Sequence, residues 1–182
     1  MIIFDLDGTL ADCEHRRHYV DPLKNDGVIQ WCDTSTGKTH YGTGYIDGIF
    51  QKWKPNWEAF YDDCDKDTPI QQSVEIYESL LFENDIRCGH EIEIWSGRCE
   101  SVRKKTELWL ELHVWGSVSR KLRMRKIGDS TPDDILKERW LDESLSEDKK
   151  IDFVFDDRPK VVRMWRRRGI FVFDANQSRE EF

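Results

Sequence analysis

Two aspartates stand two residues apart directly after an apolar run at the start of the chain. The run from Met1 to Phe4 is typical of a buried strand, and Asp5 and Asp7 follow it at once. Because alternate side chains of an extended strand share a face, both carboxylates start on one side of the sheet, and Gly8 then allows a sharp turn. Two like charges held this close repel each other unless a cation lies between them, and Mg²⁺ prefers oxygen ligands. A carboxylate can also attack phosphorus as a nucleophile, so this pattern predicts metal-assisted phosphoryl chemistry.

The elements that must position these residues alternate along the chain. Strands are predicted at 2–4, 92–95, 121–124, 151–155 and 170–173, and helices at 74–83, 100–113, 133–141 and 161–169. This alternation predicts an α/β domain with a parallel sheet. Ligands of such sheets bind at the carboxyl ends of the strands. Three polar clusters fall at these ends: Asp5 with Asp7, Ser96 with Arg98, and Asp156 with Asp157.

A segment of about residues 12–69 does not fit the alternation. It is rich in aromatic residues and also holds many Gly, Asp and Thr residues. We predict that residues 1–182 form a single domain in which this segment is an inserted cap or lid over the site. Its aromatic side chains either stack on a terminal base or form the small core of the cap.

Composition excludes several classes of protein. The 182 residues are 38% apolar, which is enough for a core, and the net charge of -8 argues against a protein that coats duplex nucleic acid. No run approaches the roughly 18 apolar residues of a membrane span, so no membrane partner is expected. The five cysteines are odd in number and form no CxxC pair. Reduced thiols in a cytoplasmic protein are therefore the expectation.

Four motifs, in order, resemble those of haloacid dehalogenase-like (HAD) phosphatases. They are Asp5-Leu6-Asp7-Gly8-Thr9, Ile94-Trp95-Ser96-Gly97-Arg98, the single Lys137, and Phe155-Asp156-Asp157-Arg158. Order and rough spacing agree over nearly the whole chain. The resemblance implies a HAD-like doubly wound parallel sheet with helices on both faces and a small inserted cap.

The resemblance also implies a role for each matching residue. Asp5 would attack phosphorus and form an aspartyl-phosphate, and Asp7 would protonate the leaving oxygen and then activate water. Lys137 would neutralise charge at Asp5, while the second motif would hold the phosphate. The implied phosphate-binding residues of the first two motifs are Thr9, Ser96, Gly97 and Arg98. The implied direct Mg²⁺ ligands are Asp5, the backbone carbonyl of Asp7, and Asp156. Asp157 would bind the ion through a water molecule or would hydrogen-bond to its direct ligands.

The second half of the chain has a closer resemblance, to the 3′-phosphatase domain of phage polynucleotide kinase-phosphatases. It rests on Met124–Asp129, Asp133–Glu138, Asp156–Arg158 and Val161–Arg166. That family also uses an arginine soon after the first motif to bind phosphate, which falls at Arg16. It further uses, at the substrate site, an acid four residues before the lysine, which falls at Asp133. Residues at i and i+4 share a helix face, so Asp133 is expected to orient Lys137. The alternative is an acid favoured by the positive end of the helix dipole.

Two basic stretches stand out in an otherwise acidic chain. One holds Arg120, Lys121, Arg123, Arg125 and Lys126, and the other holds Arg163, Arg166, Arg167 and Arg168. They are either solvated faces or contacts for the backbone of a nucleic-acid strand.

The implied activity is a Mg²⁺-dependent phosphomonoesterase that acts on 3′-phosphate ends of DNA or RNA in end repair, with a separate kinase or ligase as a possible partner. Two alternatives stay open: a 5′-nucleotidase acting on free nucleoside monophosphates, and a non-catalytic binding module of the same fold. The motifs do not separate a strand end from a free nucleotide. An open groove at the site favours the former, and a closed pocket favours the latter.

Overall fold

The structure, a computed structural model, describes residues 1–24, 29–33, 38–46, 49–52, 54–87, 91–117 and 120–176. Within these ranges the side chains of 23, 29–52 and 83–87 are not described. In the described part of the chain no helix is both long and apolar enough to cross a membrane.

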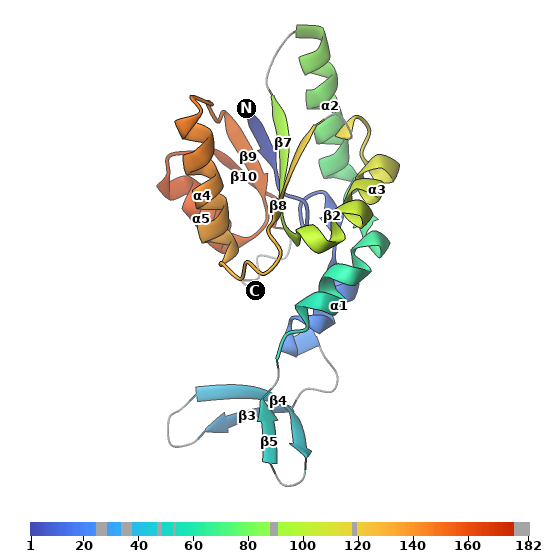
Figure 1. Cartoon of the computed structure of the whole chain (residues 1–182), viewed down its shortest axis with the longest axis vertical. Helices are drawn as coiled ribbons and strands as arrows, with labels where there is room; N and C mark the ends of the chain where they lie inside the picture. Colours follow the sequence, from blue (N-terminus) through green and yellow to red (C-terminus); the bar gives the residue numbers. More distant parts are fainter. Residues whose placement is uncertain are drawn as a thin grey trace.

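A five-stranded parallel sheet forms the centre of the fold. Its order is β10 (Val172–Asp174), β9 (Phe153–Asp156), β1 (Ile2–Phe4), β7 (Ile92–Cys99) and β8 (Lys121–Arg125). The first strand in sequence is therefore the middle strand, and the chain winds away from it in both directions (Figure 1). The predicted doubly wound parallel sheet is confirmed.

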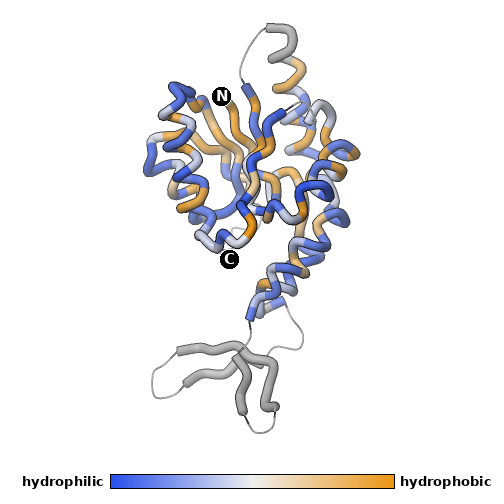
Figure 2. The backbone as a smooth tube through the Cα atoms, in the orientation of Figure 1, coloured by the Kyte–Doolittle hydropathy of each residue, from blue (hydrophilic) through white to orange (hydrophobic). Residues whose placement is uncertain are grey.

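Helices cover both faces of this sheet. On one face α2 (Gln71–Arg87) and α3 (Arg103–His113) pack on Ile2 and Phe4, and on the other α4 (Asp133–Ser146) and α5 (Pro159–Arg167) pack on Ile3. Side chains of a strand alternate between faces, so one short strand serves both cores. Figure 2 shows apolar residues along the central strands and hydrophilic residues on the outer faces of the helices.

Between β1 and α2 the chain leaves the main sheet and returns to it. It leaves at β2 (Ala11–Asp12) and returns at β6 (Thr68–Pro69), and these two short strands pair antiparallel. The intervening elements are η1 (Glu14–Tyr19), η2 (Pro22–Lys24), β3 (Ile29–Asp33), β4 (Lys38–Ile46), β5 (Ile49–Lys52), α1 (Trp57–Asp62) and η3 (Asp63–Lys66). Strands β3, β4 and β5 form a separate antiparallel sheet (Figure 1).

Several element boundaries differ from the sequence prediction. Helix α2 continues past Asn84 and Asp85 to Arg87, because these two residues have only modestly unfavourable helix propensity. Strand β7 continues past Ser96 to Cys99, because β8 pairs with it beyond an irregularity in the register. A 3₁₀ turn, η4 (Glu100–Val102), then precedes α3. Neither Asn84 and Asp85 in α2 nor Ser96 in β7 therefore ends its element where the local sequence pattern predicts.

Candidate active site

The predicted polar clusters meet at one edge of the sheet. Phe4 pairs with Ile94 on one side and with Phe155 on the other, so Asp5, Ser96 and Asp156 end neighbouring strands at similar heights. Asp5 is 6% exposed, and both Ser96 and Asp156 are fully buried. The prediction that these motifs converge at the carboxyl ends of the strands is confirmed.

A tight turn follows β1 and carries the first motif. Gly8 has a φ of 84°, and its amide donates to the carbonyl of Ala11 at 2.7 Å. A left-handed φ is costly for a residue with a Cβ, which explains glycine at this position. Thr9 is buried in the turn, and its Oγ1 has no hydrogen-bond partner within the described part of the chain. The turn leaves Asp5 and Asp7 lining one cavity.

Lys137 reaches the edge of the sheet from α4. Leu141 lies one helical turn further on and is fully buried in the core, so this face of the helix points to the sheet. The Lys137 ammonium donates to Asp5 Oδ1 at 2.7 Å and to Asp156 Oδ2 at 2.8 Å. Burial opposes its charge, but Asp156 and Asp5 raise the pKa of Lys137 above its ordinary value. Lys137 therefore stays protonated between the two carboxylates.

Three carboxylates gather beside this lysine. One oxygen of each of Asp5, Asp156 and Asp157 lies within 4.8 Å of the others, and all three residues are buried. Burial raises the pKa of Asp5, with Asp156 and Asp157 adding to the rise and Lys137 opposing it. Burial and the charge of Asp156 likewise raise the pKa of Asp157 to about 7. The raised pKa values of Asp5 and Asp157 indicate that the positive charge of Lys137 does not compensate for the burial and mutual repulsion of these carboxylates.

The acidic cluster has the chemistry of a site for a divalent cation. Asp157 Oδ1 is buried and has no partner among the described residues. A Cβ at Gly8 would lie 2.0 Å from Asp157 Oδ2, so the glycine leaves room for this carboxylate. Buried polar atoms are ordinarily paired, and oxygen ligands suit Mg²⁺. The residues present fit the metal predicted from the sequence.

Asp7 lies in a second, separate cluster with two arginines. Its Oδ1 accepts from Arg16 Nη2 at 2.7 Å and from Arg98 Nη2 at 2.6 Å. Burial would raise its pKa, but Arg98 and Arg16 hold the pKa of Asp7 well below its ordinary value. The same arginines bind the carboxylate of Asp67, which Arg16 contacts through both Nε and Nη2, at 2.7 and 2.6 Å. Both guanidinium groups, expected on the phosphate, are directed at carboxylates here.

Asp133 makes a third cluster, also with two arginines. Its two carboxylate oxygens accept from Arg125 and Arg158, and Gly97 packs so closely that a Cβ there would lie 2.6 Å from Asp133 Oδ1. Because Lys137 donates to other acids, the predicted direct orientation of Lys137 by Asp133 is wrong. The two groups influence each other by charge: Arg158, Lys137 and Arg125 outweigh burial and lower the pKa of Asp133.

An open cavity of about 1000 Å³ joins these clusters. Asp5, Asp7 and Gly97 lie at its inner end, and its walls are α1 and residues 125–133. Tyr61 of α1 donates to the carbonyl of Gly97 at 3.3 Å, which ties this helix to the end of β7. Ser96 lies behind this surface, with its Oγ accepting from the amide of Arg98 at 3.2 Å.

Sequence reasoning missed two residues of these clusters and left a third undecided. Asp67 was missed, although it directly precedes β6, the point where the chain rejoins the main sheet. Arg158 was noted only as the end of a motif. Arg125 belonged to the first basic stretch, but it is 9% exposed and donates to the carbonyl of Gly97 at 3.0 Å. In the second stretch, by contrast, Arg167 and Arg168 pair with Glu138 on the outer face of α4.

Comparison with protein families gives one match that covers most of the chain. Residues 46–179 match the polynucleotide kinase PNKP phosphatase domain. This span contains Ser96, Lys137 and Asp156, whereas Asp5 and Asp7 precede it.

Two solved structures are similar to the chain over nearly its whole length. One is a structure of the Pnkp1/Rnl/Hen1 RNA repair complex, with 22% identity and a TM-score of 0.59 over 95% of this chain and 41% of the other. The second is a structure of the Pnkp1/Rnl/Hen1 complex, with 23% identity and a TM-score of 0.60 over 96% of this chain and 45% of the other. This chain spans less than half the length of either, and the likeness shows the fold they share.

Proposed function

The chain belongs to the family of polynucleotide kinase PNKP phosphatase domains and is a HAD-like phosphatase, and on that premise we propose that it removes 3′-phosphate ends from DNA or RNA in a Mg²⁺-dependent reaction. The observation that carries this proposal is the position of Asp5. Its carboxylate lines the cavity, 2.7 Å from the Lys137 ammonium, in a cluster with Asp156 and Asp157. A carboxylate with these neighbours suits attack on a phosphate better than the packing role of a binding module.

In the proposed reaction an oxygen of Asp5 forms a bond to phosphorus while the bond from phosphorus to the 3′ oxygen breaks. Asp7 gives a proton to that leaving oxygen, and water then hydrolyses the aspartyl-phosphate to inorganic phosphate. When bound, a Mg²⁺ ion held by Asp5, Asp156, Asp157 and the Asp7 carbonyl would offset the charge of nucleophile and phosphate. Gly97, which lines the cavity, is proposed to hold a phosphate oxygen directly. Thr9 and Ser96, which are fully buried, are proposed to bind phosphate oxygens only when the bound substrate shifts this edge of the sheet.

Asp7 must loosen from Arg16 and Arg98 and take up a proton from solvent before it can donate one, because both arginines favour its charged form. A phosphate dianion offers the same guanidinium groups a bidentate partner. We therefore propose that Arg16 and Arg98 shift part of their hydrogen bonding to the substrate, so that phosphate binding and proton donation are linked. Asp133 is proposed to act on the substrate indirectly, because it holds Arg125 and Arg158 in place beside Gly97.

We also propose a domain organisation, a partner and a cellular location for this chain. We assign residues 12–69 to a cap within a single domain of residues 1–182. Both similar structures are of Pnkp1/Rnl/Hen1 complexes, one of them described as an RNA repair complex, and on this ground we propose that this chain works with a separate kinase or ligase. A cytoplasmic location is proposed from the cysteines, of which Cys13, Cys64 and Cys99 are free thiols.

The test compares phosphate release from four substrates at equal concentration: a 3′-phosphorylated oligonucleotide, its 5′-phosphorylated twin, a free 3′-nucleotide and a free 5′-nucleotide. The proposal expects the first to be turned over with the highest kcat/KM, only when Mg²⁺ is present. A preference for the free 5′-nucleotide would contradict the proposed 3′-phosphatase activity and would indicate a 5′-nucleotidase instead. Asp5→Asn should abolish release on every substrate while the protein stays folded, and substantial turnover by this variant would remove Asp5 as the nucleophile.

A further inference from the structure

The cavity is larger than the reaction at Asp5 requires. Its volume of about 1000 Å³ is at the upper end of the roughly 300–1,000 Å³ of small-molecule sites, and it is partly open to solvent. It extends from the acids at the edge of the sheet to α1 on one side and residues 126–132 on the other. A terminal phosphate and its sugar fill only the inner end, so the outer part has room for more of the substrate.

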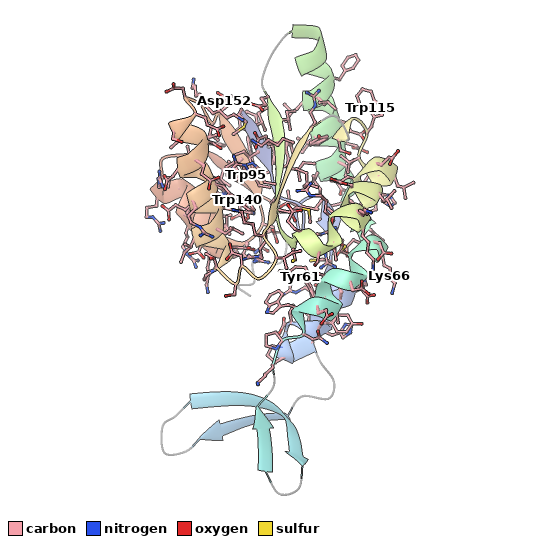
Figure 3. The ribbon with its side chains drawn as sticks, viewed as in Figure 1. Tyr61, Lys66, Trp95, Trp115, Trp140 and Asp152 are labelled. Atoms are coloured by element: carbon pink, nitrogen blue, oxygen red, sulfur yellow. The ribbon has the colours of Figure 1, made fainter. Side chains whose placement is uncertain are left out.

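The α1 wall presents an aromatic surface to this outer part. Trp57 lines the cavity with 46% of its surface exposed. Its ring stacks on Tyr61, with centroids 6.0 Å apart and planes at 29°, and it meets Phe60 edge-on at 5.7 Å. Tyr61 is fixed by its bond to the Gly97 carbonyl, and Figure 3 shows it between α1 and the carboxyl edge of the sheet. The indole is therefore held in place from behind while its surroundings stay open.

The two walls differ in charge. The α1 wall carries the exposed carboxylates of Glu58 and Asp62, and Asp62 is paired with Lys105. The opposite wall carries the exposed ammonium of Lys126 and the carboxylate of Asp129, whose charge Arg139 offsets. The net charge is therefore negative at Glu58 and positive at Lys126. A phosphodiester is repelled by the first wall and attracted by the second. A strand entering the cavity should therefore turn its bases to α1 and its backbone to Lys126.

We propose that the outer cavity binds the last unpaired nucleotides of a 3′ end, with Trp57 as the stacking platform for a base and Lys126 as a backbone contact. This inference rests on the proposed function, which it narrows to single-stranded 3′ ends. Stacking of a base on an aromatic side chain tolerates any sequence and contributes about 5- to 150-fold in affinity per base. A base inside a duplex has both faces covered, so it must be unpaired before it can reach Trp57.

The first experiment measures kcat/KM on a single-stranded 3′-phosphorylated oligonucleotide for the wild-type chain and three variants. Trp57→Ala should lower kcat/KM about tenfold, mainly through KM, and Trp57→Phe should retain most of it. The matched control is Trp115→Ala, since Trp115 is 60% exposed and lies far from Tyr61 in Figure 3. This control should leave kcat/KM unchanged. Equal values for Trp57→Ala and Trp115→Ala would overturn the inference.

A second substrate separates stacking from a structural effect of the substitution. An oligonucleotide whose last two nucleotides lack their bases should be a poorer substrate for the wild-type protein, by about the factor that Trp57→Ala costs on the normal strand. Trp57→Ala should then cost little more on the abasic strand. An equal loss on both strands would show that Trp57 acts through the fold and would overturn the inference. If the wild-type protein releases no phosphate from either strand, the proposed function itself fails.

Discussion

At the scale of single residues, Asp7 and Asp67 share two buried arginines. Arg98 Nη2 lies 2.6 Å from Asp7 Oδ1 and 2.5 Å from Asp67 Oδ2, and Arg16 Nη2 lies 2.7 and 2.6 Å from the same two atoms. Two acids and two bases balance in charge, which is the condition under which buried ions are tolerated. Asp67 thus keeps both guanidinium groups beside Asp7 without taking part in the proposed chemistry itself.

Asp67→Asn tests this arrangement. The amide keeps the shape of the side chain but leaves two buried arginines with one carboxylate, so the free energy of unfolding should fall by about 3–5 kcal/mol. Denaturant unfolding followed by tryptophan fluorescence measures the change. Asp142→Asn is the control, because Asp142 pairs with Arg168 at an exposed position and its loss should matter far less. Equal unfolding free energies for the two variants would contradict the role assigned to Asp67.

Gly8→Ala tests the space that the glycine leaves for Asp157. The new Cβ would lie 2.0 Å from Oδ2 and 2.4 Å from Cγ of Asp157, so this carboxylate must rotate away from Asp5 and Asp156. We expect Mg²⁺ affinity, measured by calorimetric titration, to fall about 10- to 100-fold.

Gly169→Ala is a matched control for this substitution. Gly169 has a φ of 72°, close to the 84° of Gly8, but no atom lies within 4 Å of its added Cβ. Both variants should lose about 1–2 kcal/mol of stability from the left-handed backbone, and Gly8→Ala alone should lose metal affinity. Unchanged Mg²⁺ affinity in Gly8→Ala would show that Asp157 is not needed in the cluster.

At the scale of elements, the strand ends were predictable and the contacts between distant loops were not. An apolar run that stops at an acid or a serine is a local signal, and it located Asp5, Ser96 and Asp156. The pairing of Asp67 with Arg98 joins residues 31 positions apart and follows no periodicity. Helix ends also escaped prediction, since α2 runs through Asn84 and Asp85 to Arg87. The local pattern therefore predicted the edge of the sheet that carries the proposed site, whereas the groups that hold this edge in place depend on tertiary contacts.

Strand β7 contains a buried acid, Glu93, on the face of the sheet covered by α4 and α5, and we predict that it makes the stability of the protein depend on pH. Glu93 is fully buried and accepts from Trp95 Nε1 at 2.7 Å and from Lys149 Nζ at 2.8 Å. Burial opposes the charge, but Lys149, Trp95 and Lys121 together lower the pKa of Glu93 below its ordinary 4.5. A lowered folded pKa means that stability is fully present above about pH 4.5 and is lost as pH falls through the folded value.

Glu93→Gln should therefore be less stable than the wild type at pH 7, and the difference should shrink as the pH falls below about 4.5. Thermal unfolding midpoints of both proteins between pH 7 and pH 3 measure this convergence. Glu143→Gln is the control, because Glu143 pairs with Arg123 at an exposed position and its curve should follow the wild type. A constant gap between Glu93→Gln and the wild type at all pH values would contradict the assigned role of the charge.

At the scale of the whole molecule, the site is built from two parts of the chain. The sheet contributes Asp5 and Asp156, and the segment between β2 and β6 contributes Arg16, Tyr61 and Asp67. With a net charge of -8, the protein as a whole repels nucleic acid at long range. Affinity for a strand end must therefore come from short-range contacts inside the cavity, and binding should depend only weakly on salt.

We predict that the acidic cluster of Asp5, Asp156 and Asp157 links the stability of the whole molecule to pH and to Mg²⁺. The pKa of Asp157 is about 7 in the folded protein and, unfolded, close to its ordinary 3.8, so the folded state binds the additional proton between these values. In chelator, stability should fall as the pH rises from about 4 to 7 and level off above that. Added Mg²⁺ should restore it most at pH 8, because a ligand that binds only the folded state raises the unfolding midpoint.

Asp157→Asn distinguishes repulsion between the carboxylates from Mg²⁺ binding, because the two effects change the unfolding midpoint in opposite directions. Without metal at pH 8, the variant should be more stable than the wild type, because one of three crowded charges is gone. With Mg²⁺ it should gain less than the wild type, so the order of the two midpoints should approach reversal. Asp129→Asn, a change on the cavity wall at an acid paired with Arg139, should respond to Mg²⁺ as the wild type does. If Asp157→Asn is destabilised in chelator and keeps its full response to Mg²⁺, the cluster is not a metal site, because its carboxylates would then neither repel one another nor share a cation.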